Sequence, residues 1–114
     1  MGAINTRPSL PVPDELSALI ADAQETLRPV EFWLFGSRAR GDARPDSDWD
    51  VLAVVSDGAT DDVLDPELAW RIRYRQETPV TFLTTKQGEL ASIWGLPNTL
   101  GYDLAREGIR LLVS

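Results

Sequence analysis

A polar stretch between two apolar runs restricts the folds that are open to this chain. The apolar runs are residues 32–35 and 51–55, and short runs rich in aromatic and β-branched residues are typical of buried strands. Residues 36–50 lie between them and read Gly-Ser-Arg-Ala-Arg-Gly-Asp-Ala-Arg-Pro-Asp-Ser-Asp-Trp-Asp. We therefore expect two strands joined by a polar connection, and the connection is the candidate functional site.

The first part of this connection has the features of a phosphate-binding turn. Gly36 carries no side chain where the chain leaves the first strand, so an anionic group can approach the backbone amides closely. Ser37 could cap a short following helix with its hydroxyl, and a helix N-terminus attracts phosphate. Arg38, Arg40 and Arg44 add positive charge. Only some of these three arginines can point into a shared cleft.

The last part of the connection has the features of a metal site. Asp48 and Asp50 are two residues apart, and side chains at that spacing project from the same face of an extended strand. Two carboxylates repel each other unless a cation lies between them, and Mg²⁺ prefers oxygen ligands. Trp49 should face the opposite side of the strand, where we expect it in the core; stacking on a nucleotide is the alternative.

Each of these features also occurs in ordinary proteins without any function. Glycine-serine pairs are common in turns, and charged loops are usually just solvated. What favours a phosphate and metal site is their fixed order between two apolar strands.

Composition limits the class of protein and the chemistry. The chain has 114 residues, 43% hydrophobic and 25% charged, which fits one soluble globular domain. No apolar run reaches membrane-spanning length and Met1 to Pro13 lacks the regions of a signal peptide, so we expect a cytoplasmic protein. Cysteine and histidine are absent. A general base would therefore be a carboxylate, a lysine, a tyrosine or the acceptor substrate.

The net charge of −7 argues against direct nucleic-acid binding. A basic cleft on an acidic body, or a basic partner, remains compatible with this charge. One predicted helix nevertheless gathers basic and aromatic residues, namely Trp70, Arg71, Arg73, Tyr74 and Arg75. Three interpretations stay open for this helix: a solvated surface, a docking face for a protein partner, or a nucleic-acid face.

The hydrophobic pattern predicts alternating helices and strands. The predicted helices cover residues 13–27, 65–76, 85–93 and 98–107, and the predicted strands cover residues 30–35, 51–55, 79–84 and 109–113. Asp65 and Thr85 are the expected N-caps of their helices. We therefore predict an α/β (α+β) fold with a small mixed sheet flanked by helices. Residues 1–12 are expected to form an extended N-terminal arm, and residues 13–114 the domain.

Gly36-Ser37, then ten residues, then Asp48-x-Asp50 resembles the signature of the polymerase-beta-like nucleotidyltransferase superfamily and of its small branch, the minimal nucleotidyltransferases. The fuller form, GSRARG with SDxD downstream, is matched without a gap. The resemblance implies a nucleotidyltransferase fold in which the glycine-serine turn holds the triphosphate of ATP or another nucleoside triphosphate. It implies that Asp48 and Asp50 are the catalytic pair and ligate Mg²⁺. The candidate nucleotide-binding residues are Gly36, Ser37, Arg38 and Arg40.

One position departs from this family pattern. Minimal nucleotidyltransferases usually place a third carboxylate on a later strand, after a Pro-Val step, and this chain has Thr81 there. Threonine carries no charge and cannot hold a metal as a carboxylate does. Glu77 could take over only if the strand began earlier or the chain bent back. Transfer would then be slow, since the acceptor hydroxyl loses its base and some charge stabilisation.

The resemblance also implies a biological role. Many minimal nucleotidyltransferases are antitoxins that silence a helical HEPN-type toxin, by AMP transfer to a tyrosine or by docking. The small size of this chain fits an acceptor that is another protein and completes the cleft. Two alternatives are a weakly catalytic binding module that neutralises its partner sterically, and an enzyme that modifies a small molecule such as an aminoglycoside.

Overall fold

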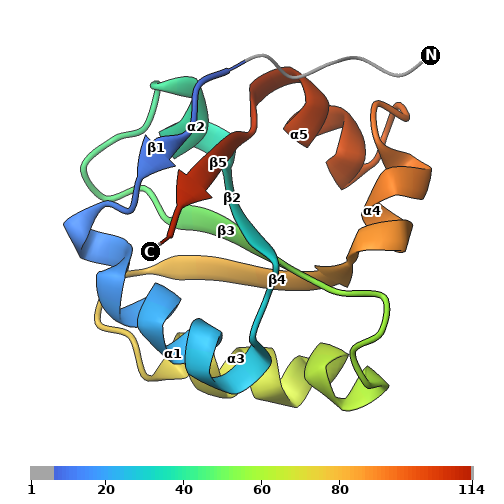
Figure 1. Ribbon diagram of the computed structural model, residues 1–114. Helices are drawn as coiled ribbons and strands as arrows, with labels where there is room; N and C mark the ends of the chain where they lie inside the picture. Colours follow the sequence, from blue (N-terminus) through green and yellow to red (C-terminus); the bar gives the residue numbers. More distant parts are fainter. Residues whose placement is uncertain (1–6, 114) are drawn as a thin grey trace.

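Five strands form one mixed sheet with helices on both faces (Figure 1). The computed structural model describes residues 7–113. The strands are β1 (Leu10–Pro11), β2 (Glu31–Phe35), β3 (Trp49–Val55), β4 (Val80–Lys86) and β5 (Ile109–Leu112). The helices are α1 (Ser17–Leu27), α2 (Gly36–Arg40), α3 (Pro66–Tyr74), α4 (Gln87–Ile93) and α5 (Leu100–Glu107), with 3-10 turns η1 (Asp14–Leu16) and η2 (Asp61–Leu64). The predicted fold class is confirmed.

The strand order is β1-β5-β2-β3-β4, so the strands on either side of the polar connection are neighbours. β2 runs antiparallel to β3 and to β5, whereas the β3–β4 and β1–β5 pairs are parallel. In this register Asp50 lies beside Phe35 on one side and beside Thr81 on the other. The end of β2, the start of β3 and the start of β4 therefore meet at one edge of the sheet.

Apolar side chains fill the space on both faces of the sheet. On one face α1 and α3 cover alternate residues of the central strands, among them Phe32, Leu34 and Val51. On the other face α4 and α5 cover a smaller cluster that includes Trp33 and Leu52. Full burial of a large apolar side chain contributes about 1.5–3 kcal/mol. Within residues 7–113, no helix combines the length and the apolar character that a membrane crossing requires.

Strand pairing extends two elements beyond their predicted bounds. β3 begins at Trp49 rather than at residue 51, because Trp49 pairs with Val80 of β4. β4 continues to Lys86, which pairs with Val55. The predicted cap at Thr85 is therefore wrong: Thr85 belongs to the strand, and Lys86 precedes α4 without a side-chain cap.

The predicted cap at Asp65 is confirmed. Asp65 caps α3, since its Oδ1 accepts a hydrogen bond from the Glu67 amide at 2.9 Å. That helix ends at Tyr74, two residues before the predicted end. The last helix begins at Leu100 because the Thr99 hydroxyl accepts a hydrogen bond from the Tyr102 amide.

Part of the predicted N-terminal arm is attached to the domain. Residues 1–6 lie outside the described residues. Leu10 and Pro11 pair with β5 as strand β1. The Arg7 guanidinium donates to the carbonyl of Ala39 at 2.8 Å and to the carbonyl of Glu107, at the ends of α2 and α5. Residues 7–11 therefore hold together the last strand and two helices that are distant in sequence.

Candidate nucleotide and metal site

The bend after β2 is made by a glycine in the left-handed region of backbone space. Gly36 has φ of +71°, a conformation that costs side-chain-bearing residues about 1 kcal/mol or somewhat more. α2 begins at Gly36 itself, and the residue before it is Phe35, which makes no side-chain cap. The predicted capping role of Ser37 is therefore wrong. Ser37 is the second residue of α2, because the chain turns into the helix one residue too early for it to act as a cap.

The carboxylate of Asp50 lies directly against this bend. A Cβ atom added to Gly36 would collide with Oδ2 of Asp50 and would stand 3.0 Å from Cγ of the same carboxylate. The pairing of Phe35 with Asp50 across β2 and β3 produces this contact. The glycine-serine bend and one of the two predicted metal ligands therefore share one place at the edge of the sheet.

Several groups act on the Asp50 carboxylate. Partial burial raises its pKa, and the negative charge of Asp48 raises it further. A hydrogen bond from Thr81 and the positive charge of Arg40 act in the opposite direction. Asp48 itself is exposed and lies one residue before β3. Two carboxylates that repel each other at the end of a sheet are suited to a hard divalent cation, whose remaining positions water or phosphate oxygens can fill.

Thr81 occupies the place where the family pattern expects a third carboxylate. It pairs with Asp50 in the parallel β3–β4 register, and its hydroxyl donates a hydrogen bond to the Asp50 carboxylate. Within residues 7–113 no cluster of three acidic, cysteine or histidine residues could hold a metal ion. Glu77 lies in the turn before β4 and lines a hollow with Trp70 and Tyr74. It does not replace the missing acid.

We expect Thr81→Asp to increase Mg²⁺ affinity. A third carboxylate beside Asp50 adds negative charge, which bound Mg²⁺ would neutralise. Without Mg²⁺ the carboxylates repel one another. The variant should therefore be less stable than the wild type in EDTA and should gain more in melting temperature from Mg²⁺, which thermal unfolding at a series of Mg²⁺ concentrations measures. Ser92→Asp, which adds the same charge at an exposed position of α4, is the matched control. Equal Mg²⁺ responses in both variants would contradict the placement of Thr81 at the metal.

Arg38 supports the loop that leads to Asp48. Its Nη2 atom donates to the carbonyls of Pro45 at 3.2 Å and Ser47 at 2.9 Å. Its guanidinium carbon lies 4.6 Å from the centre of the Trp49 ring, and Trp49 packs against the core on the face opposite Asp50. In this arrangement Arg38 holds the loop, so its predicted contact with a phosphate would require these hydrogen bonds to break.

Arg38→Met should therefore destabilise the fold and loosen the approach to Asp48. Loss of charge-assisted hydrogen bonds to two carbonyls costs about 2 kcal/mol, which urea unfolding would measure. Arg44→Met, in the same loop but exposed, should change the free energy of unfolding by less than about 0.5 kcal/mol. If both variants unfold at the same urea concentration, the loop does not depend on Arg38.

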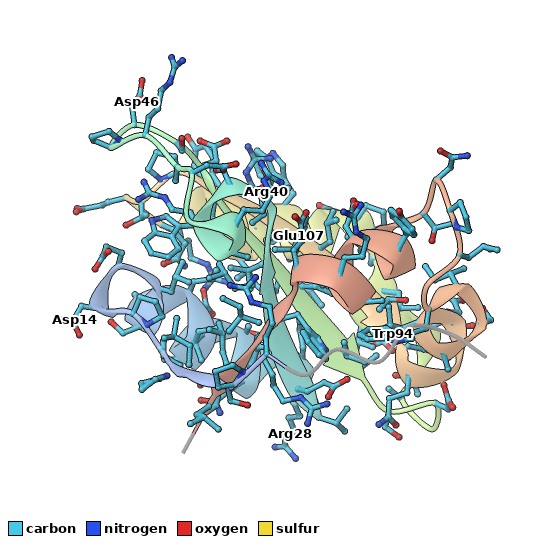
Figure 2. The ribbon with its side chains drawn as sticks, turned by 90° about the horizontal axis from the view of Figure 1, so that it is seen from above. Asp14, Arg28, Arg40, Asp46, Trp94 and Glu107 are labelled. Carbon is cyan, nitrogen blue, oxygen red and sulfur yellow. The ribbon has the colours of Figure 1, made fainter. Side chains whose placement is uncertain are left out.

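Arg40 is the arginine whose charge reaches Asp50. Its Nε atom lies 3.1 Å from Asp42 Oδ2 and its Nη1 atom lies 3.2 Å from Glu107 Oε1. Figure 2 shows Arg40 beside Glu107, while Asp46 stands at the tip of the loop, away from both. No local pattern indicated Glu107, which is 67 residues away from Arg40. A phosphate at the bend would compete with these two carboxylates for Arg40.

The model of the nucleotidyltransferase domain family matches residues 16–94, which contain the bend, both aspartates and Thr81. The chain belongs to the nucleotidyltransferase domain family. A comparison of this nucleotidyltransferase domain with curated protein sequences gave no match.

Two solved structures are similar to this nucleotidyltransferase domain. The first is described as a toxin-antitoxin crystallised with AMP-PNP, with 20% identity and a TM-score of 0.46 over 63% of this chain. The match covers 57% of that structure's chain. The second is described as a putative nucleotidyltransferase from Sulfolobus solfataricus, with 22% identity and a TM-score of 0.44 over 71% of this chain and 81% of the other.

Proposed function

We propose that this domain transfers a nucleoside monophosphate, in the simplest case AMP from ATP, to a hydroxyl on a partner toxin of the HEPN type. The observation that carries the transfer chemistry is the contact between the Asp50 carboxylate and the Gly36 bend. The bend offers backbone amides to phosphate, while Asp48 and Asp50 provide the anionic ligands. The partner class comes from the sequence resemblance, and membership of the family supports the reaction class.

The chain's own residues would act mainly by positioning the reactants and neutralising charge. The amides at Gly36 and Ser37 would hold the β- and γ-phosphates, with Arg40 turned from Glu107 toward them. Mg²⁺, when bound by Asp48 and Asp50, would supply positive charge to the phosphate oxygens. The acceptor oxygen bonds to the α-phosphorus, the bond to pyrophosphate breaks, and the acceptor's proton passes to water. No histidine is present to take that proton.

A second function is favoured by Thr81. Thr81 places a hydroxyl where the family pattern has a carboxylate, so the site could bind nucleotide and yet transfer the nucleoside monophosphate only slowly. The domain would then silence its partner by docking. The two functions differ in whether they depend on the charge of Asp48. Transfer depends on its charge, whereas docking alone does not.

The test combines the purified domain, Mg²⁺ and ATP labelled at the α-phosphate with the protein encoded by the adjacent gene. Transfer predicts label on that protein, lost in Asp48→Ala and kept in Asp46→Ala, a matched control at the exposed tip of the same loop. Tight binding with no label and no effect of Asp48→Ala would establish docking instead. If the neighbour neither binds nor takes label, the partner assignment is wrong.

A further inference from the structure

The outer edge of β4 and the adjacent face of α3 form a surface that the site does not use. β4 is the last strand of the sheet, and its seven residues have a neighbour only on the β3 side within the described chain. Trp49 donates to the Pro79 carbonyl, and in the parallel register this directs the amides and carbonyls of Val80, Phe82, Thr84 and Lys86 outward. Such a long open edge is a template for another strand.

Exposed apolar side chains border this edge on both faces of the sheet. On α3, Trp70 and Tyr74 are 56% and 74% exposed, and their rings stack with centres 4.9 Å apart. On the opposite face Leu83, in the middle of β4, is 41% exposed. Two open hollows of about 420 and 350 Å³ lie along α3 and β4, and both are lined by Trp70 and Arg73. In the isolated chain this apolar surface is in contact with water, which favours its burial against another molecule.

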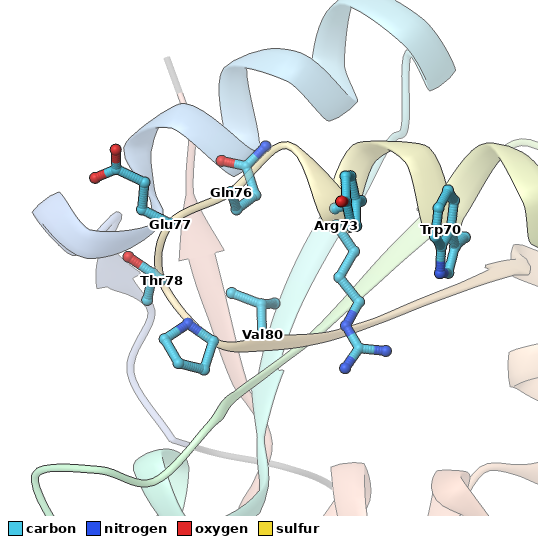
Figure 3. Close-up of a pocket in the computed structure, with 8 residues that line it drawn as sticks. Trp70, Arg73, Gln76, Glu77, Thr78 and Val80 are labelled. Atoms are coloured by element: carbon cyan, nitrogen blue, oxygen red, sulfur yellow. The ribbon is translucent and has the colours of Figure 1, made fainter.

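The charges on α3 are arranged so that this helix could pair with the same helix of a second copy. Arg71 pairs with Glu67 and Arg75 pairs with Asp22, but no ion pair within residues 7–113 engages the Arg73 guanidinium. Figure 3 shows this side chain reaching from α3 toward β4, next to Trp70. Glu67 and Arg73 lie three residues before and three residues after Trp70. If two α3 helices packed antiparallel about Trp70, Arg73 of each would face Glu67 of the other.

The surface is also locally neutral on an acidic protein. Residues 65–77 contain the acids Asp65, Glu67 and Glu77 and the bases Arg71, Arg73 and Arg75, a net charge of zero, whereas the whole chain carries −7. Most pairs of surfaces from two copies would repel each other. This surface is one at which two copies could meet without that repulsion.

We propose that a second copy of this chain occupies the surface, with the two β4 strands antiparallel about Leu83 in one continuous ten-stranded sheet. Phe82 of each copy then pairs with Thr84 of the other through the outward backbone groups, and the Leu83 side chains meet at the two-fold axis. The Trp70 side chains pack together on the α3 face. Thr81 comes opposite Thr85 of the second copy, so the second copy borders the nucleotide site. This pairing does not depend on nucleotidyl transfer.

The first measurement is sedimentation velocity of the full chain over a wide concentration range. The molar mass should rise from 12.6 kDa toward twice that value. Arg73→Glu should raise the dissociation constant of the dimer at least about tenfold, and the double variant Glu67→Arg/Arg73→Glu should restore it, because each copy then presents the exchanged charges to the other. A chain that stays at 12.6 kDa up to about 1 mM overturns the proposal.

The second measurement uses the absence of cysteine from the chain. Directly opposed residues of a non-hydrogen-bonded antiparallel pair have Cα atoms about 4.5 Å apart, within the range of a disulfide. Leu83→Cys should therefore oxidise to a covalent dimer at low micromolar concentration, whereas Leu96→Cys, which is 50% exposed in the loop between α4 and α5, should not. Equal cross-linking of both variants contradicts the register. So does a monomeric chain that instead binds an extended peptide along β4.

Discussion

Asp50→Asn is expected to abolish nucleotidyl transfer and, at the same time, to stabilise the metal-free domain at neutral pH. Loss of one of the two charges that we propose to ligate Mg²⁺ should lower the transfer rate at least about 100-fold. Stability should increase because the pKa of Asp50 is raised in the folded state, first by burial and then by the charge of Asp48. Asparagine keeps the shape of the side chain and removes the charge that the fold disfavours.

The direction of the pH dependence follows from the raised pKa. Between the unfolded and the folded pKa of Asp50, the folded state still holds a proton that the unfolded chain has lost. The free energy of unfolding therefore falls as pH rises through this window, and the full cost remains at neutral pH. Thermal unfolding in EDTA should check this. As pH rises through this window, the free energy of unfolding should fall less for Asp50→Asn than for the wild type.

Asp46→Asn is the matched control for this prediction. It removes the same charge at the exposed tip of the loop, so it should change neither the transfer rate nor the stability. Mg²⁺ should raise the melting temperature of Asp46→Asn as it does that of the wild type, and should leave that of Asp50→Asn nearly unchanged. A fully active Asp50→Asn would remove the basis of the proposed function.

Gly36→Ala is expected to damage both the fold and the site. The new side chain would be held at φ of +71° and would collide with Oδ2 of Asp50. The left-handed backbone alone costs about 1 kcal/mol, and the collision should add about 1–3 kcal/mol. Because the Asp50 carboxylate must move away from the bend to relieve the collision, transfer should fall by about 100-fold or more. Urea unfolding and the labelled-ATP assay measure the two effects separately.

Gly41→Ala separates the backbone effect from the collision. Gly41 ends α2 at φ of +84°, and its amide donates to the Ser37 carbonyl at 3.0 Å. A Cβ atom there would meet no other atom within 4 Å. Gly41→Ala should therefore lose about 1 kcal/mol of stability and keep its transfer activity. If it lost activity as completely as Gly36→Ala, the backbone of α2, and not the contact with Asp50, would limit the reaction.

The parts of the structure that could be predicted from sequence are those with a local cause. The apolar runs placed β2 and β3, because strand periodicity acts within a few residues. The position of Thr81, which pairs with Asp50, was expected from the family resemblance and not from a local rule. The errors at Ser37 and Thr85 have one cause: both are good capping residues, but their positions were set by the bend at Gly36 and by the pairing of β4 with β3. Caps can be predicted only after the ends of the strands are known.

The roles of long side chains could not be predicted, since they depend on residues distant in sequence. Arg38 and Arg40 are two residues apart in one helix, and the sequence presented both as phosphate ligands. Arg38 donates hydrogen bonds to loop carbonyls and lies over the Trp49 ring, whereas Arg40 forms an ion pair with Glu107 in the last helix. Helical spacing sends their side chains in different directions. What each arginine meets depends on the path of residues 41–48 and on the packing of α5.

The pairing of Phe35 with Asp50 makes residues 36–49, topologically, the connection of a two-stranded hairpin. A connection whose two ends are fixed by the ladder can change in length at little entropic cost. The segment between α2 and Asp48 could therefore change in length while the remaining strands keep their partners.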